Sequence, residues 1–568
     1  MSRTTADEMA ALLAAAGVQR VYGRTGMALS PMPEALQRHK RLRCIGLQSE
    51  ESAACAAVGE SMLTGALSVC CGSSGNGNLM LSGGLYEAMR SKLPILALAP
   101  HIPLSTIGTH YFQETSPTHS LRDCSLYCEQ ANTAAQAQQV LREALRQASV
   151  RHGAAVTVLP SDVADLPVHT PPHPEILPYA PRKVQPETSQ VIRLAELINN
   201  SPKVVFLCGK GCEGSRDLII ELAGRVGAPI AYTLRAKDIM ERENPCAVGM
   251  IGLLGWGDAP AAVQVADLLV MWGTDFPYSC YLPKQAKIAQ VDADATVLGR
   301  RTRLCHAVHG DVGKVAAELL PLIRPHRPED FLMRSLLRHR QAVSALEGVL
   351  RDIDERAPMR PEVITRLLST HAEPDAIFSL DIGPPVIWAA RYLQAIGKRR
   401  IIGSFNFGNI GCALPLAIGA KAACPSRQVI ALSHADSPCT LLAELHSLLR
   451  EKLSIKICVY NTARPSAELT QGAVPTPHGI DFAAIAAASG LESYRLSTPD
   501  GATTTIRRWL AARGPALLDA ALDPHALPQP PDSPMLRTLD HLDSTAPQTG
   551  RQELQAIRRL LFGNCRFY

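Results

Sequence analysis

The chain has 568 residues, of which 46% are hydrophobic and 19% charged, and its formal net charge at pH 7 is +5. A length of this kind predicts about three or four domains. So small a net charge, with no basic patch interleaved with aromatic residues, argues against a nucleic-acid-binding protein. No run reaches the roughly 18 to 20 apolar residues that a membrane span needs.

The first residues, MSRTTADEMAALLAAAGV, predict an amphipathic helix with a polar cap. They lack the apolar core and cleavage site of a signal peptide, so we expect a cytoplasmic protein. The 16 cysteines are scattered through apolar segments and form no paired CxxC motifs, which argues against zinc. We therefore expect reduced thiols packed as small hydrophobic side chains.

The first block of alternating strand and helix patterns runs from the N-terminus to about Val168. Its segment GSSGNGNLML contains Gly72, Gly75 and Gly77, which would let backbone amides approach a ligand or would simply form a tight turn. Upstream, Glu50 and Glu51 follow the predicted strand RCIGL and begin a helix of small residues. A carboxylate there either favours the helix dipole or polarises a cofactor ring.

A proline-rich linker, HTPPHPEILPYAPRKVQPE, precedes a second block that extends from about Thr188 to Leu320. Its strands KVVFLC, PIAYTL, DLLVMWG and KIAQVD each end at polar or glycine residues, which is where open α/β sheets bind nucleotides. Gly209, Gly211 and Gly214 form a GxGxxG motif after the first of these strands. Asp292 is placed to accept hydrogen bonds from ribose hydroxyls, although an empty crevice is the alternative.

The third block runs from about Met359 to Leu522, and its strands are AIFSLDI, QVIALS, IKICVYN and ALLDAAL. Strand–helix alternation in all three blocks predicts an α/β protein with three doubly wound parallel sheets. The predicted domains are residues 1–172, 186–325 and 355–525, followed by a tail over residues 526–568. The tail places Leu554, Ile557 and Leu560 on one helical face, which packs on the body or contacts a membrane surface.

Several segments resemble the thiamine-diphosphate (ThDP) enzymes of the acetolactate synthase and pyruvate oxidase group, most of all the quinone-linked bacterial pyruvate oxidases. They include HIPLSTIGTHYFQETSP, LCGKGCEG, GMIGLLG, GTDFPY, FSLDIGPPVIWAARYL and GKRRIIGSFNFGNIGCALPLAIGA. The resemblance implies a pyrimidine-binding domain, a central FAD-binding domain and a diphosphate-binding domain, in that order. It also implies a homo-oligomer, a dimer or tetramer, whose active sites lie between the first domain of one chain and the third of another.

The resemblance also assigns roles to single residues. Glu50 matches the glutamate that activates ThDP, Phe112 and Gln113 match positions between flavin and ThDP, and Ile410 matches the apolar residue that bends ThDP. Gln48 and Ser49 stand where the family commonly has Arg-His. The FAD-binding matches are Gly209, Gly211, Arg235, Gly249, Gly273, Thr274, Asp292 and Asp311.

The departure from the family lies in RQVIALSHADSPCTLL. The family's Gly-Asp-Gly aligns with His434, Ala435 and Asp436, and its metal-binding Asn aligns with Thr462. Mg²⁺ needs oxygen ligands in near-octahedral geometry, usually with one or two carboxylates, and Ala435 supplies none. The sequence therefore predicts that the Mg²⁺–ThDP site is lost and that the chain has no metal ligands.

Three hypotheses follow. The first is an FAD-dependent oxidoreductase that acts on a small molecule without ThDP and passes electrons to oxygen or a quinone. The second is a ThDP- and FAD-dependent 2-oxo acid decarboxylase or oxidase with rebuilt diphosphate contacts. The third is a non-catalytic FAD-binding paralogue. Cys71, Cys412 and Cys439 lie near glycine turns and are candidate thiols, with buried packing as the alternative.

Overall fold

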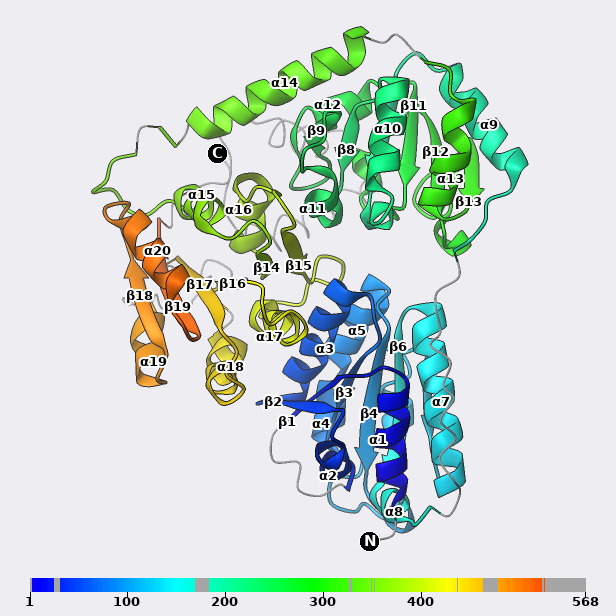
Figure 1. Cartoon of the computed structure of the whole chain (residues 1–568), viewed down its shortest axis with the longest axis vertical. Helices are drawn as coiled ribbons and strands as arrows, with labels where there is room; N and C mark the ends of the chain where they lie inside the picture. Colours follow the sequence, from blue (N-terminus) through cyan, green and yellow to red (C-terminus); the bar gives the residue numbers. More distant parts are fainter. Residues whose placement is uncertain are drawn as a thin grey trace.

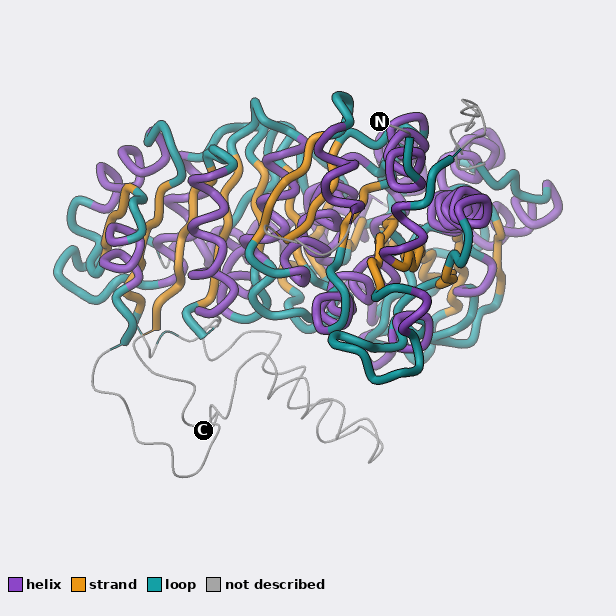
Figure 2. The backbone as a smooth tube through the Cα atoms, turned by 90° about the horizontal axis from the view of Figure 1, so that it is seen from below, coloured by secondary structure: helices purple, strands orange, loops and turns teal. Residues whose placement is uncertain are grey.

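The computed structural model describes residues 3–24, 31–168, 183–325, 329–348, 350–351, 353–436, 438–462, 479–523 and 526. The predicted linker falls mostly outside these ranges, and the predicted tail falls outside them except for Ala526. Three separate sheets lie between layers of helices, so the predicted α/β class is confirmed (Figures 1 and 2). Within the described ranges, no helix has both the length and the apolar character that crossing a membrane requires.

The first sheet has six parallel strands in the order β2-β1-β3-β4-β6-β5. Its central strands β3 and β4 are buried throughout, as expected of parallel strands covered on both faces. The strands are β1 (Arg20–Arg24), β2 (Arg43–Leu47), β3 (Ser68–Cys71), β4 (Ile95–His101), β5 (Tyr127–Gln130) and β6 (Ala154–Pro160). The helices are α1 (Thr5–Ala15), α2 (Pro31–Arg38), α3 (Glu50–Thr64), α4 (Asn76–Met80), α5 (Ser82–Ser91), α6 (Pro117–Ser120), α7 (Ala134–Arg151) and α8 (Ser161–Asp165).

The central sheet has the order β10-β9-β8-β7-β11-β12-β13, and β10 alone among them runs antiparallel to its neighbour. The strands are β7 (Val204–Cys208), β8 (Ile230–Tyr232), β9 (Ala247–Met250), β10 (Trp256–Gly257), β11 (Leu268–Trp272), β12 (Lys287–Asp292) and β13 (His306–His309). The α-helices are α9 (Thr188–Asn199), α10 (Arg216–Val226), α11 (Lys237–Met240), α12 (Ala259–Gln264) and α13 (Val312–Leu319). The long helix α14 (Glu329–Gly348) runs from this domain toward the third (Figure 1).

The third sheet is parallel, in the order β15-β14-β16-β17-β19-β18. Its strands are β14 (Ile377–Leu380), β15 (Arg400–Gly403), β16 (Val429–His434), β17 (Ile455–Thr462), β18 (Glu492–Leu496) and β19 (Ala516–Leu522). Its helices are α15 (Pro361–His371), α16 (Pro384–Tyr392), α17 (Ala413–Ala423), α18 (Pro438–Arg450), α19 (Phe482–Ala488) and α20 (Ala502–Ala511). Every strand named from the apolar runs of this block is present.

The first and third domains share one hydrophobic core, because α3 packs against α17 (Figure 1). Both helices are rich in alanine and glycine, which brings their backbones close together. A Cβ atom on Gly419 would overlap the carbonyl oxygen of Ala56, and one on Gly59 would overlap the carbonyl oxygen of Leu416. Small residues at this crossing therefore fix the position of one domain on the other.

The close crossing predicts that Gly419→Ala destabilises the protein by about 3 kcal/mol, since backbone atoms cannot move aside as a flexible side chain can. Gly224→Ala in α10 is the matched control, because nothing lies within 4 Å of its added Cβ. The control should stabilise by about 0.5–1 kcal/mol through helix propensity. Urea unfolding of both variants measures the difference, and equal effects would contradict the packing argument.

Candidate active site

Glu50 is the first residue of α3, but Ser49 provides the helix cap, since its hydroxyl accepts the Ser52 amide hydrogen at 3.1 Å. The Glu50 side chain turns inward and is 1% exposed. The Ser73 hydroxyl, from the loop after β3, donates a hydrogen bond to its carboxylate. A carboxylate this deeply buried is held by a specific partner and does more than complement the helix dipole.

Glycines at the start of α4 allow Glu50 and Gln113 to approach this helix closely. A Cβ on Gly77 would overlap the Glu50 carboxylate, and one on Gly75 would lie 2.9 Å from Gln113 Cβ. Gln113 itself has φ of 65°, a left-handed conformation that is strained for a residue other than glycine. Phe112 stands apart from this group and is 74% exposed. The structure therefore brings together two of the three predicted catalytic residues.

The predicted flavin-binding glycines meet at the carboxyl edge of the central sheet. A Cβ on Gly211 would lie 2.7 Å from Gly273 Cα, and one on Gly209 would overlap Thr274. The loops after β7 and β11 thus pack directly on each other, and these glycines are required by that packing whatever binds there. Gly249 has φ of 112° and lies within β9, opposite Gly257 of β10 and at an irregularity in the pairing of β9 with β8, so its conformation serves the sheet.

The two predicted acidic residues of this edge differ in their surroundings. Asp311 caps α13, since its carboxylate accepts the amide hydrogens of Gly313 and Lys314 at 3.1 and 3.2 Å. Asp292 ends β12, and one of its oxygens accepts the Asp294 amide hydrogen at 3.0 Å. Burial raises the pKa of Asp292, and the neighbouring amide opposes that rise. Asp292 is the better placed of the two to accept a hydrogen bond from a ligand.

Arg235 lies where all three domains meet, in a short 3₁₀ turn over Leu234–Ala236. Burial lowers the pKa of Arg235, while Glu87 of α5 and Glu213 oppose this shift. Glu87 is 1% exposed and accepts hydrogen bonds from Ser91, at 2.6 Å, and from Ser404 of the third domain. Sequence reasoning missed Glu87, since nothing in LYEAMRS distinguishes a buried carboxylate from a surface one.

Asp381 organises the carboxyl edge of the third sheet and was also missed. It follows β14, is 2% exposed, and accepts the amide hydrogens of Ala413 at 2.9 Å and His434 at 3.1 Å. It thereby ties the start of α17 to the end of β16. Burial raises the pKa of Asp381 to about 6, although the backbone amides pull it down. The only sequence signal is its place directly after a buried strand.

The turn after β16 lies where the sequence predicts the altered diphosphate site. His434 pairs with Tyr460 of β17, and the Ala435 amide donates to the Tyr460 carbonyl at 3.3 Å. The His434 Nδ1 atom lies 3.8 Å from the nearest carboxylate oxygen of Asp436. The ring also faces Gly383, whose added Cβ would be 3.8 Å from Nδ1. Burial lowers the pKa of His434, and Asp436 opposes that shift, which favours a neutral imidazole at pH 7.

The side chains around this turn do not fit a Mg²⁺ site. The Ala435 side chain packs against the hydrophobic core shared with the first domain. Asn461 turns away from the edge and donates to Asp519 at 2.9 Å, while Thr462 ends β17. Both oxygens of Asp381 already accept amide hydrogens. In the described ranges, no three His, Cys, Asp or Glu residues cluster closely enough to hold a metal ion.

The remaining predicted residues are spread out. Ile410 precedes α17 and is 54% exposed, so a single chain leaves it open to solvent. Cys71 and Cys412 are both buried. Burial is the main cause that raises the pKa of Cys71, and the hydrogen bond with Cys55 is the main cause that raises the pKa of Cys412. Cys439 is exposed. The loop TARPSAELTQGAVPTPHG after Thr462 lies largely outside the described residues.

Models of one family match all three domains. The thiamine pyrophosphate enzyme N-terminal TPP binding domain matches residues 3–120, the central domain matches residues 191–319, and the C-terminal TPP binding domain matches residues 381–520. Each match falls on one of the three sheets described above.

Related proteins agree with these matches. An uncharacterized 42.6 kDa protein of Pseudomonas amyloderamosa is 42% identical over 60% of this chain and 87% of its own length. A putative thiamine pyrophosphate-containing protein, YdaP, of Bacillus subtilis is 28% identical over 92% of each chain. The pyruvate oxidase of Lactiplantibacillus plantarum is 27% identical over 90% of this chain and 87% of its own.

Asp381 should leave a mark on the pH dependence of stability. Because its folded-state pKa of about 6 exceeds the ordinary aspartate pKa of 3.8, its contribution favours the folded state at low pH and is lost as pH rises through 6. Relative to Asp381→Asn, the wild-type protein should lose about 3 kcal/mol of stability between pH 3.5 and pH 7. Urea unfolding at several pH values measures this, and parallel curves for the two proteins would contradict it.

Proposed function

Because this chain belongs to the thiamine pyrophosphate enzyme family, we propose that it is an FAD-dependent oxidoreductase on that scaffold that works without Mg²⁺–ThDP. The observation that carries the proposal is the turn at His434–Asp436. It occupies the carboxyl edge of the third sheet and presents an imidazole and a methyl group where a metal–diphosphate site needs a carboxylate. The substrate class is a small organic molecule.

The electrostatics of the turn support this reading. A diphosphate carries several negative charges that a metal ion or arginine and lysine side chains must balance. His434 is neutral at pH 7 because burial lowers its pKa, and the nearby Asp436 adds negative charge. The His434 imidazole also narrows the space beside Gly383 that a diphosphate would have to enter. Among the described residues, the turn therefore offers a diphosphate no cluster of metal ligands and no arginine or lysine.

The central domain supplies residues that fit FAD. Gly209, Gly211 and Gly273 bring the backbone close to the sheet edge. In the described residues, only one carboxylate oxygen of Asp292 accepts a backbone amide hydrogen, which leaves the other oxygen for a ligand. Arg235 adds a positive charge near the junction with the first domain. A bound FAD supplies a two-electron acceptor that oxygen or a quinone then reoxidises. The protein's part is to position the cofactor and hold the substrate's proton.

Glu50 is the candidate base. Its buried carboxylate can accept a proton from a substrate hydroxyl or carbon, and the Ser73 hydroxyl keeps it in one orientation. The exposed Phe112 and Ile410 are apolar surfaces that a second copy of this chain covers in a dimer or tetramer. We propose a cytoplasmic homo-oligomer. A membrane contact through the tail would involve residues outside the described ranges.

A second function, a ThDP- and FAD-dependent 2-oxo acid decarboxylase or oxidase, is favoured by one specific observation. Glu50 is a buried carboxylate held by the Ser73 hydroxyl, and it stands where the family's ThDP-activating glutamate is expected. The match of residues 381–520 to a TPP binding domain points the same way. Measuring the bound cofactors decides between the two functions.

The purified protein should show a flavin spectrum, and mass spectrometry of the released cofactors should find FAD without ThDP. Adding Mg²⁺ and ThDP should leave calorimetric titrations flat, because the turn lacks the ligands. The combined variant H434G, A435D, D436G and T462N restores the family's residues and should gain ThDP binding. Stoichiometric ThDP in the wild-type protein would overturn the ThDP-free proposal and favour the second function.

A substrate found by anaerobic bleaching of the flavin would allow Glu50 to be tested. Glu50→Gln should slow bleaching at least about 100-fold, the size of effect expected from losing a general base. Glu51→Gln is the matched control, because Glu51 occupies the same first helical turn but is less buried. Glu51→Gln should keep the wild-type rate of flavin bleaching, measured by stopped flow. An equal loss of rate in both variants would show that the two carboxylates act only through the helix dipole and that Glu50 is not the base.

A further inference from the structure

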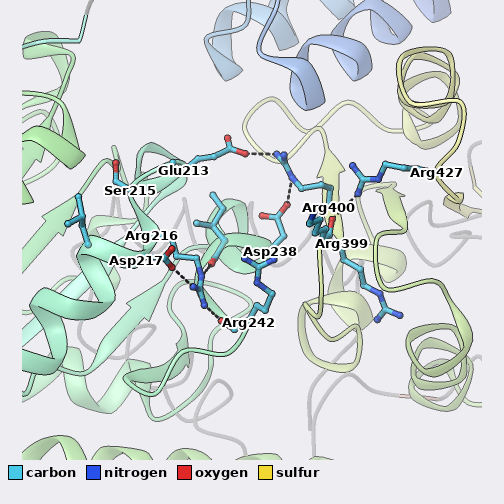
Figure 3. Close-up of a pocket in the computed structure, with 13 residues that line it drawn as sticks. Glu213, Ser215, Arg216, Asp217, Asp238, Arg242, Arg399, Arg400 and Arg427 are labelled. Atoms are coloured by element: carbon cyan, nitrogen blue, oxygen red, sulfur yellow. Dashed lines mark hydrogen bonds and ion pairs between the residues drawn. The ribbon is translucent and has the colours of Figure 1, made fainter.

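A cleft of about 480 Å³ lies between the central and third domains (Figure 3). One wall is formed by the loop and first turn of α10 together with α11, and the other by residues 398–400 and Arg427. Arg400 begins β15 and Arg427 lies just before β16, so the cleft is at the amino edge of the third sheet. The turn at His434 is at the opposite edge. Gly214 of the GxGxxG motif lines the cleft, whereas none of the residues matched to FAD binding does.

The walls carry more positive than negative side chains. Three acids line the cleft: Glu213, Asp217 and Asp238. Twice as many cationic side chains do so: Arg216, Arg242, Lys398, Arg399, Arg400 and Arg427. At neutral pH the lining therefore holds three positive charges in excess, which is unusual for a domain boundary that only has to pack.

Two arginines account for the three acids. Arg400 reaches across the boundary and pairs with Glu213 at 2.9 Å and with Asp238 at 3.0 Å (Figure 3). Arg216 pairs with Asp217 at 2.7 Å. The two Arg400 pairs join the two walls, whereas the Arg216–Asp217 pair lies within one wall. The other four cations have no acidic partner among the lining residues.

Of the remaining cations, Arg427 lies near one carboxylate, and the other three are held by neutral groups or by none. Arg242 and Arg399 donate to backbone carbonyls, which orient a guanidinium but do not cancel its charge. Arg427 donates to the carbonyls of Asp375 and Lys398 at 2.7 and 2.9 Å, and the Asp375 carboxylate is 3.9 Å away. Lys398 is exposed, and no described hydrogen bond or ion pair engages its amine.

We infer that this cleft binds a diphosphate group, either as free pyrophosphate or as part of a nucleoside diphosphate. A diphosphate carries about three negative charges at neutral pH, about two of them on its terminal phosphate, which matches the excess on the walls. Arginine is the side chain best suited to phosphate oxygens, and the amino end of α10 adds partial positive charge. The volume accommodates a nucleotide-sized ligand.

The ligand of this cleft acts as an effector and not as a substrate. It would contact both domains at once, and neither Glu50 nor the turn at His434 lines the cleft. Binding therefore changes how firmly the central and third domains are joined. This inference does not depend on whether the protein uses ThDP.

Isothermal titration of the full-length, FAD-loaded protein tests the site. Inorganic pyrophosphate and ADP are titrated separately, without Mg²⁺ and at low salt. We expect saturable binding whose affinity falls as the salt concentration rises. The affinity should fall at least about tenfold in Lys398→Glu, and Lys398→Gln should have an intermediate affinity. Lys40→Glu is the matched control, since Lys40 is also exposed and precedes an arginine but belongs to the first domain. His434→Ala should bind as wild type.

The two ligands distinguish the sources of the diphosphate. Equal affinities identify the diphosphate alone as the recognised group, and tighter binding of ADP adds the nucleoside; both results support the site. Absence of binding by both ligands would overturn the inference. So would equal losses in Lys398→Glu and Lys40→Glu, which would show only nonspecific attraction, or loss in His434→Ala, which would place the anion at the turn.

Discussion

The close crossing of α3 and α17 is the contact on which both edges of the candidate site depend. Glu50 begins α3, and Ile410 lies just before α17, so the packing of Gly59 and Gly419 sets where both residues stand. Neither helix has a strongly amphipathic pattern, because small residues cover the contact. Backbone complementarity, more than bulky side chains, holds the first domain on the third.

The turn at His434 is held by backbone contacts and not by the side chains of His434 and Ala435. The register of β16 with β17 continues to the His434–Tyr460 pair, and Asp381 holds the turn through a backbone amide. Backbone amides are present whatever the side chain. The backbone geometry at this edge therefore does not depend on which side chains stand at positions 434 and 435.

The sequence predicted most of the sheets, because buried parallel strands appear as continuous apolar runs such as VVFLC and VIALS. It missed edge strands such as β5 and β18, whose YCEQ and ESYRL are half exposed and carry charge. Glu87 and Asp381 were missed because burial of a carboxylate is a tertiary property. Gly209 and Gly211 were predicted as ligand residues, yet packing against the loop at Gly273 already requires them.

The strand β15 connects the basic cleft with the junction of the three domains. It begins at Arg400, which pairs with Glu213 and Asp238 of the central domain. It ends at Gly403, and the next residue, Ser404, donates to the buried Glu87 of the first domain. Because β15 has only four residues, these two contacts lie close together in the chain. Arg235 lies in the field of both Glu87 and Glu213, so the proposed anion in the cleft would act on Arg235 through Glu213.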